Sequence, residues 1–203
     1  MGKYEENKHW HWKEIPTTHR TKKEYFEYLR LNIGMITGKI ILDIGAGTRR
    51  FAKEINALGI GAEVYSVDPI YYVSIDEIDK QLLKSKENIE YIKAFNTSEV
   101  KQRTVAALGE ELPFKDKRFD LVISNFCFPM YANNKRQVEN FFTDIARVLK
   151  NSGEIRLYPL CWFGGNKKEV VLAIDIQIDT MVRSGLFRII ENKNDLLVLR
   201  KNS

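Results

Sequence analysis

The sequence predicts an α/β fold: a doubly wound sheet of about seven strands, mostly parallel, with an antiparallel last strand. Three observations predict it. Short apolar runs alternate with amphipathic segments from Lys39 onward, as in successive strand–helix units. The first run, 40–44, enters a glycine turn at 45–47 that leads into an amphipathic segment. The two final runs are joined by a turn too short for a parallel crossover, so the last strand should be antiparallel.

The first half of the chain is expected to alternate helices and strands. Apolar residues at helical spacing follow the glycine turn, and Gly59 is placed to end that helix. Ser74 to Glu77 has the form of a capping box and should open another helix. In chain order we expect helix 22–33, strand 39–44, helix 49–58, strand 63–67, helix 74–87, helical or irregular chain 88–101, and strand 103–107.

The second half contains the best-patterned helix, whose apolar face is followed by the turn-forming run Asn151, Ser152 and Gly153. The residues on that face are Val138, Phe141, Phe142, Ile145, Val148 and Leu149. The strand 119–124 should precede this helix. The strand 154–158, the helix 167–184, and the strands 187–190 and 196–200 should follow it.

Composition indicates one domain over residues 1–203, with a polar and aromatic N-terminal segment (1–30) before the core (31–203). Apolar content of 44% and charged content of 29% are ordinary for a globular protein. No apolar run reaches the roughly 20 residues of a membrane span, and the polar N-terminus is unlike a signal peptide. Two cysteines form no disulfide framework and too few ligands for structural zinc, so we expect a cytoplasmic protein without a metal.

Net charge is +5, and residues 1–50 contain ten Lys and Arg against six Asp and Glu. This mildly basic N-terminal part is compatible with an acidic substrate or RNA, although a solvated surface explains it as well.

The glycine turn and the next strand predict a nucleoside-containing cofactor. Glycine lets a ligand approach the backbone, and the following helix directs its positive end toward it. Asp68 ends the next strand about 20 residues later, the spacing of a carboxylate that binds a ribose. A dinucleotide site requires a third glycine where this chain has Arg50, which argues against a nicotinamide-dependent reductase.

Three blocks resemble the class I S-adenosylmethionine (SAM) methyltransferases. Asp43, Gly45 and Gly47 match their motif I, Asp/Glu-x-Gly-x-Gly-x-Gly. Residues 110–124, EELPFKDKRFDLVIS, and residues 146–154, ARVLKNSGE, match two later blocks in the correct order. The resemblance covers about residues 39–160 and is greatest to the broad group that includes ubiquinone- and menaquinone-pathway methyltransferases. It implies a Rossmann-like fold, SAM as the cofactor, and methyl transfer as the reaction.

The resemblance also implies which residues bind SAM. The methionine part would lie against Gly45, Ala46 and Gly47, and Asp43 would orient its amino end. Asp68 would accept hydrogen bonds from both ribose hydroxyls. We therefore expect Asp68→Ala to weaken SAM binding at least tenfold, with little change in stability because a strand end should face ligand or solvent.

Two further segments would complete the cofactor site. Leu108 and Gly109 fall where the family often has an acid for the adenine amino group, which leaves backbone groups and apolar stacking here. Ser124 and Asn125 would lie beside the transferable methyl. Arg49 replaces the third glycine of motif I, and its long side chain could crowd the loop or contact the carboxylate of SAM.

The sequence assigns no catalytic residue but offers candidates. The first candidates are His9 and His11, in the segment 1–30 that the resemblance implies would cap the acceptor, and Tyr131, after the fourth strand. His19 in the same segment and Tyr158 at the end of the fifth strand are further candidates. Methyl transfer needs alignment first, and a base only for some acceptors. The segment from Asn125 onward is not the Asn/Asp-Pro-Pro-Tyr/Phe motif, which argues against an exocyclic adenine amine. The loop 161–165 is expected to form a lip over an apolar acceptor.

The expected function is therefore SAM-dependent methyl transfer to a small-molecule acceptor. An RNA methyltransferase that uses the basic N-terminal third is one alternative. A non-catalytic SAM-binding regulatory protein is a second, because no base is evident.

Overall fold

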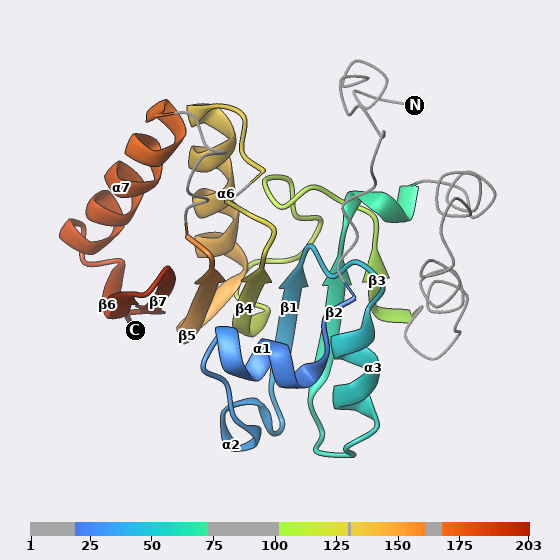
Figure 1. Cartoon of the computed structure of the whole chain (residues 1–203). Coiled ribbons are helices and arrows are strands. Elements are labelled where there is room, and N and C mark those ends of the chain that lie inside the picture. The colour runs from blue at the N-terminus through green and yellow to red at the C-terminus, as the bar shows by residue number, and fades with distance from the viewer. Residues whose placement is uncertain (1–18, 73–101, 130, 161–167) are drawn as a thin grey trace.

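A seven-stranded sheet forms the centre of the computed structural model, which describes residues 19–72, 102–129, 131–160 and 168–203 (Figure 1). The strand order is β3-β2-β1-β4-β5-β7-β6. The strands are β1 Ile40–Ile44, β2 Glu63–Val67, β3 Thr104–Val105, β4 Phe119–Asn125, β5 Leu149–Tyr158, β6 Phe187–Lys193 and β7 Leu196–Lys201. The neighbours β1 to β5 run parallel, whereas β7 is antiparallel to both β5 and β6, so the predicted fold class is confirmed.

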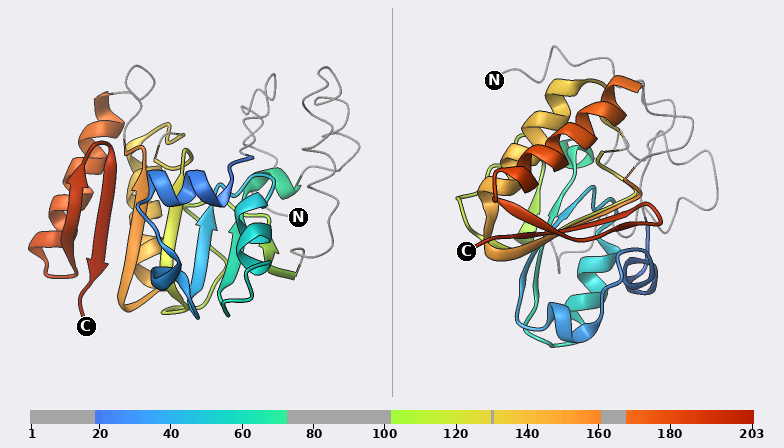
Figure 2. Two further views of the ribbon diagram at one scale, coloured as in Figure 1. Left: turned by 60° about the horizontal axis from the view of Figure 1, so that its bottom comes forward. Right: turned by 90° about the vertical axis from the view of Figure 1, so that its left-hand side faces the viewer.

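Helices cover both faces of this sheet (Figure 2). α6 and α7 lie on one face, and the N-terminal helices and α3 lie on the other. The helical segments are α1 Lys22–Tyr28, α2 Ile33–Ile36, α3 Arg50–Asn56, the 3₁₀ turn η1 Pro69–Tyr72, α6 Lys135–Val148 and α7 Lys168–Arg183. None of the described helices is long and apolar enough to cross a membrane.

Two of the expected element boundaries were wrong. The single helix expected over 22–33 is two short helices, because Arg30 has a left-handed conformation (φ 49°) and Asn32 caps a new turn through the N–H of Met35. The run 151–153 does not separate α6 from β5. The strand begins at Leu149, and 151–153 occupy an irregularity in the pairing with β4, where the register shifts.

The other expected elements in the described part are present, with small changes of length. β3 is only two residues long, and α3 ends three residues before Gly59. The helix expected over 74–87 and the segment 88–101 lie outside the described residues.

Each face of the sheet has its own buried apolar cluster. The α6/α7 face is built around Phe119, Phe141 and Phe142, all fully buried. The opposite face is built around Tyr25 and Phe51, whose rings stack with centroids 4.2 Å apart. This second cluster fixes α1 across the sheet, so a segment from the N-terminal part of the chain lies next to the carboxyl ends of β1 and β4.

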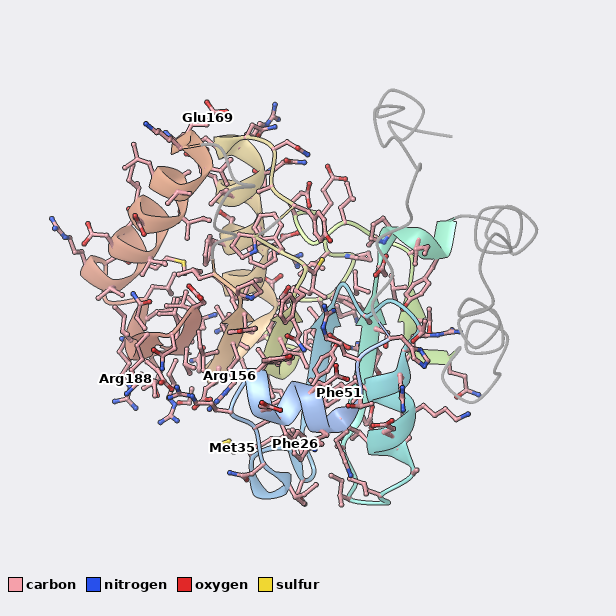
Figure 3. All side chains as sticks on the ribbon, viewed as in Figure 1. Phe26, Met35, Phe51, Arg156, Glu169 and Arg188 are labelled. Carbon is pink, nitrogen blue, oxygen red and sulfur yellow. The ribbon has the colours of Figure 1, made fainter. Side chains whose placement is uncertain are left out.

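The C-terminal end of α1 is also held by polar contacts. Arg156 of β5 points toward this helix in Figure 3, and its guanidinium donates to the carbonyl oxygens of Leu29 (2.8 Å) and Arg30 (3.1 Å). Helix ends leave carbonyl groups without intrahelical partners, and a cation there also favours the negative end of the helix. Arg156 itself pairs with Glu154, so its buried charge is neutralised.

Candidate functional site

The turn after β1 requires glycine at its first position. Gly45 has φ +76°, and a Cβ added there would lie 2.3 Å from the side chain of Cys127. Gly47 also has positive φ (+50°). The N–H groups of Gly45 and Ala46 donate to the carbonyl of Val67, which ties the turn to the end of β2. Only glycine combines this conformation with such a close approach.

Asp68 follows β2 and bridges two loops. Its carboxylate accepts hydrogen bonds from the N–H of Gly47 and the N–H of Ile70, both at 2.9 Å. Burial raises the pKa of Asp68 to about 6, and the two N–H groups oppose that rise. The carboxylate thus links the glycine turn to the turn after β2 instead of only facing ligand or solvent, and we now expect it to contribute to stability as well.

Asp43 is fully buried on β1 beneath α1. The hydroxyl of Tyr25 donates to both carboxyl oxygens at 3.1 Å. Burial raises the pKa of Asp43 to about 8. The hydrogen bond from Tyr25 opposes this rise, and the charge of Asp68 adds to it. The motif I acid is thus linked to the N-terminal helix rather than exposed on the loop.

Successive residues at the end of β4 have different surroundings. The hydroxyl of Ser124 accepts a hydrogen bond from the N–H of Phe128 at 3.0 Å. Asn125 is fully buried, and neither its amide nitrogen nor its amide oxygen has a hydrogen-bond partner among the described residues. Phe126 has φ +55°, an unusual conformation for a bulky side chain, and its N–H donates to the carbonyl of Tyr158. Unpaired buried amides and strained backbone both concentrate at functional sites.

A pocket opens at this edge of the sheet, with an empty volume of about 710 Å³ that continues into solvent. The lining residues come from the ends of β1, β2 and β4, the segment after β3, and the start of α6. They are Ile44, Gly45, Val67, Asp68, Pro69, Ala107, Leu108, Gly109, Glu110, Phe126, Cys127, Phe128, Tyr131 and Gln137.

The pocket brings together four of the nine expected cofactor-binding residues: Gly45, Asp68, Leu108 and Gly109. The other five are not part of the described lining, but each is within two positions of a lining residue in the sequence. They are Asp43, Ala46, Gly47, Ser124 and Asn125.

The segment after β3 forms a mostly apolar wall. Leu108 lines the pocket at the position where the family often has an acid and this sequence has none. Gly109 is packed closely, since an added Cβ would lie 3.0 Å from Ile44 and 3.3 Å from Phe141. A larger residue at 109 would push this wall away from β1.

Glu110 is a pocket residue for which the sequence suggested no role. Its carboxylate lines the pocket, accepts a hydrogen bond from the side-chain amide of Gln137 at 3.0 Å, and has a pKa raised by burial. In the sequence Glu110 was only part of the block 110–124 that resembles the family. Its partner Gln137 is 27 residues away, so no local pattern could predict their contact. Perturbed carboxyl groups in a pocket are candidates for function.

Two side chains near the expected methyl position are uncharged at neutral pH. Burial, then the charges of Asp68 and Asp43, raise the pKa of Cys127, so its thiol stays protonated. Tyr131 is 39% exposed at the pocket wall, and burial of its hydroxyl raises its pKa. Of the first three catalytic candidates the structure describes Tyr131, whereas His9, His11 and the loop 161–165 lie outside the described residues.

Arg49 neither lines the pocket nor crowds the glycine turn. It adopts the left-handed conformation that glycine would have there (φ 62°), and its side chain is buried toward β3. Its guanidinium donates to the hydroxyl of Thr104 at 3.2 Å and lies 5.5 Å from the centroid of the Tyr71 ring. The missing third glycine therefore leaves the turn intact.

The first described residues of the chain lie on the site. The Nδ1 atom of His19 is 2.8 Å from the hydroxyl of Thr48, at the end of the glycine turn. The guanidinium of Arg20 lies over the ring of Phe126, 4.1 Å from its centroid. Residues 19 and 20 thus contact the loops after both β1 and β4.

Comparison with known proteins agrees with this geometry. A family model described as "Methyltransferase domain" matches residues 42–157, more than half of the chain. The chain belongs to the class I SAM-dependent methyltransferases. Both the family and the cofactor inferred from the sequence are confirmed.

Individual relatives of this methyltransferase are distant. Demethylmenaquinone methyltransferase of Tropheryma whipplei is 27% identical over 123 residues, which are 61% of this chain and 42% of that protein. The chain thus spans less than half the length of this relative.

Two solved structures share the fold. A SAM-dependent methyltransferase of Methanosarcina mazei has a TM-score of 0.51 at 15% identity, covering 88% of this chain and 97% of that one. The 1,6-didemethyltoxoflavin-N1-methyltransferase of Burkholderia thailandensis, with 1,6-didemethyltoxoflavin and S-adenosylhomocysteine bound, has a TM-score of 0.50 at 16% identity over 95% of this chain and 81% of that one.

Proposed function

We propose that this protein transfers the methyl group of SAM to a small-molecule acceptor. The observation that supports this most directly is that Gly45, Asp68 and Gly109 line one pocket. Gly45 follows β1, Asp68 follows β2, and Gly109 lies after β3. In open α/β sheets, ligands bind where the strand order reverses, here between β1 and β4.

The residues around the pocket suit SAM in three ways. Asp68 uses its carboxylate for two N–H groups, and a carboxylate has roughly four acceptor sites, so two remain for the ribose hydroxyls. The unpaired buried amide of Asn125 offers a donor and an acceptor to a polar group of the methionine part. Leu108 and Pro69 provide apolar surfaces for the adenine ring.

Charge also favours this cofactor. Asp68 and Glu110 line the pocket and Asp43 lies behind it, and burial raises the pKa of all three. SAM has two positive groups, the sulfonium and the ammonium, against one carboxylate. A net positive ligand stabilises the ionised form of such buried carboxyl groups, whereas S-adenosylhomocysteine lacks the sulfonium charge.

When bound, SAM supplies an activated methyl carbon, so the protein mainly has to align the acceptor and exclude water. Phe126, Phe128 and Tyr131 form the wall on which an acceptor would lie. Asn125 and the glycine turn would orient the cofactor from the other side. Nothing in this arrangement requires a thiol nucleophile, and the protonated Cys127 acts as a spacer against Gly45.

Calorimetric titration of the full-length chain with SAM, S-adenosylhomocysteine and NADPH tests the cofactor. We expect saturable binding of both sulfur compounds and none of NADPH. A radiolabelled methyl-transfer screen across small molecules and RNA then tests the acceptor class. Salt-sensitive retention and methylation of RNA would reverse our ranking, and tight SAM binding without any turnover would indicate a regulatory protein.

The preference for a small molecule is supported by the aromatic wall that Phe126, Phe128 and Tyr131 form in the pocket. The Tropheryma relative is named for a quinone-type acceptor and the Burkholderia structure contains a small heterocycle. We extend the proposal to the organisation of the chain: residues 1–30 act as a cap on the core 31–203, and the protein works in the cytoplasm. Limited proteolysis with and without SAM tests the cap, and cell fractionation tests the location.

A further inference from the structure

The strongest additional signal is a cation held over one aromatic ring of the proposed acceptor wall. The guanidinium carbon of Arg20 lies 4.1 Å from the centroid of the Phe126 ring, and Phe126 lines the pocket. His19, the preceding residue, is anchored to Thr48 by its 2.8 Å contact. The position of Arg20 is therefore set from both sides rather than left to a long, free side chain.

The charge of Arg20 reaches beyond Phe126. Burial raises the pKa of the Tyr131 hydroxyl, and the positive charge of Arg20 opposes that rise. It likewise opposes the rise that burial causes in the pKa of Tyr25.

The described lining of the pocket contains no lysine, arginine or histidine. Its ionisable side chains are acids, Asp68 and Glu110, together with the neutral Cys127 and Tyr131. The acids follow β2 and β3, where the cofactor is proposed to bind, while the cation lies over the loop after β4. The acids of the pocket and this cation therefore lie at different loops of the site.

Resting on the proposed function, we propose that Arg20 makes this enzyme select acidic acceptors, which bind and react as anions: phenolates, enolates or carboxylates. A guanidinium against the Phe126 ring of the acceptor wall stabilises a nearby anion and repels an ammonium group, which disfavours amines. Such an acceptor needs no general base in the wall, because its proton leaves to solvent on binding.

The transfer step balances without another reactant. The anionic oxygen or carbon forms a bond to the methyl carbon as the methyl–sulfur bond breaks, and the electron pair of that bond stays on sulfur. An anion and a sulfonium thereby become a neutral methylated product and a neutral thioether, S-adenosylhomocysteine. Charge neutralisation in the step also weakens the hold of Arg20 on the product.

The test uses the full-length chain saturated with S-adenosylhomocysteine and two probes of similar shape. 4-Nitrophenol ionises and its phenolate has a distinct visible absorbance, whereas 4-nitroaniline stays neutral. We expect the protein to bind the phenolate about tenfold more tightly than the aniline and to raise the ionisation constant of bound nitrophenol about tenfold. R20Q should abolish both effects, and R20K should retain part of them.

K23Q is the matched control, because Lys23 is exposed on α1 and its loss removes the same unit charge. It should leave both readouts unchanged. Equal binding of the two probes, an unchanged ionisation constant, or the same values in R20Q would overturn the inference. The affinity for S-adenosylhomocysteine is measured first on every sample. If the unmodified chain does not bind S-adenosylhomocysteine, the proposed function itself is overturned. If it binds S-adenosylhomocysteine but shows no preference for the phenolate, only the role of Arg20 is overturned.

Discussion

Replacement of Asp68 by alanine should weaken both the fold and cofactor binding, and the structure gives a magnitude for each. The carboxylate accepts two backbone N–H groups at 2.9 Å. Hydrogen bonds to charged groups contribute about 1.5–3 kcal/mol each. Asp68 is half-buried and its pKa is raised to about 6, so the cost of burying the charge offsets part of this gain.

We therefore expect the free energy of unfolding at pH 7 to fall by about 1–2 kcal/mol in Asp68→Ala. In a chain of this length that corresponds to a decrease of roughly 2–8 °C in Tm. Two ribose hydroxyls lose their acceptor at the same time, so SAM affinity should fall at least tenfold, which is about 1.4 kcal/mol. Thermal unfolding and calorimetry on one preparation measure both quantities.

Asp120→Ala is the matched control at the opposite edge of the sheet. Asp120 also accepts a backbone N–H, that of Ile40, at 2.9 Å, and its carboxylate pairs with Lys150. This control should lose stability and keep SAM affinity. If Asp68→Ala retained full SAM affinity, the ribose role would be refuted. If its Tm did not change, the proposed bridging of the two loops would be refuted instead.

Three further predictions concern the same region. Gly45→Ala should lower stability by more than about 2 kcal/mol in thermal unfolding, because the added Cβ would lie 2.3 Å from the side chain of Cys127. Gly59→Ala is the control: Gly59 also has positive φ (+61°) but open space around it, so its replacement should lower stability by only about 1 kcal/mol. Equal losses in the two variants would contradict this reasoning. Tyr25→Phe should lower stability by about 1–3 kcal/mol in denaturant unfolding, since it leaves the Asp43 carboxyl without its donor; an unchanged midpoint would argue against this bond. Burial raises the pKa of Asp43 in the folded protein to about 8, from an ordinary value of 3.8, so the folded state binds a proton that the unfolded state has lost. The stability of the SAM-free protein should therefore fall as pH rises from 5 to 8, and Asp43→Asn should reduce this pH dependence in thermal scans. A stability that rises with pH over this range would refute the prediction.

Local patterning was enough to identify most of the fold. The 3.6-residue periodicity of α6 and the continuous apolar run of β1 reflect which side chains must leave water, and that depends on neighbours only a few positions away. The motif spacing also placed Gly45 and Asp68 correctly at one pocket, because parallel strands bring their carboxyl ends to the same edge of a sheet. Local patterning could not predict the start of β5. Residues 151–153 have the composition of a turn, and Leu149 belongs to the strand because it pairs with Phe119 of β4.

The sequence by itself determined the fold class, the family and the cofactor, because each depends on residue types at nearly fixed spacing. It did not determine the surroundings of the site residues, which depend on side chains far apart in the chain. Tyr25 and Asp43, which form a hydrogen bond, are 18 residues apart in the sequence. Arg20 near the N-terminus contacts the ring of Phe126, which lies in the second half of the chain. Contacts of this kind leave no periodic trace, since they form only after the helices have packed on the sheet, and the same packing decides which carboxyl groups are buried and how strongly their pKa values are raised.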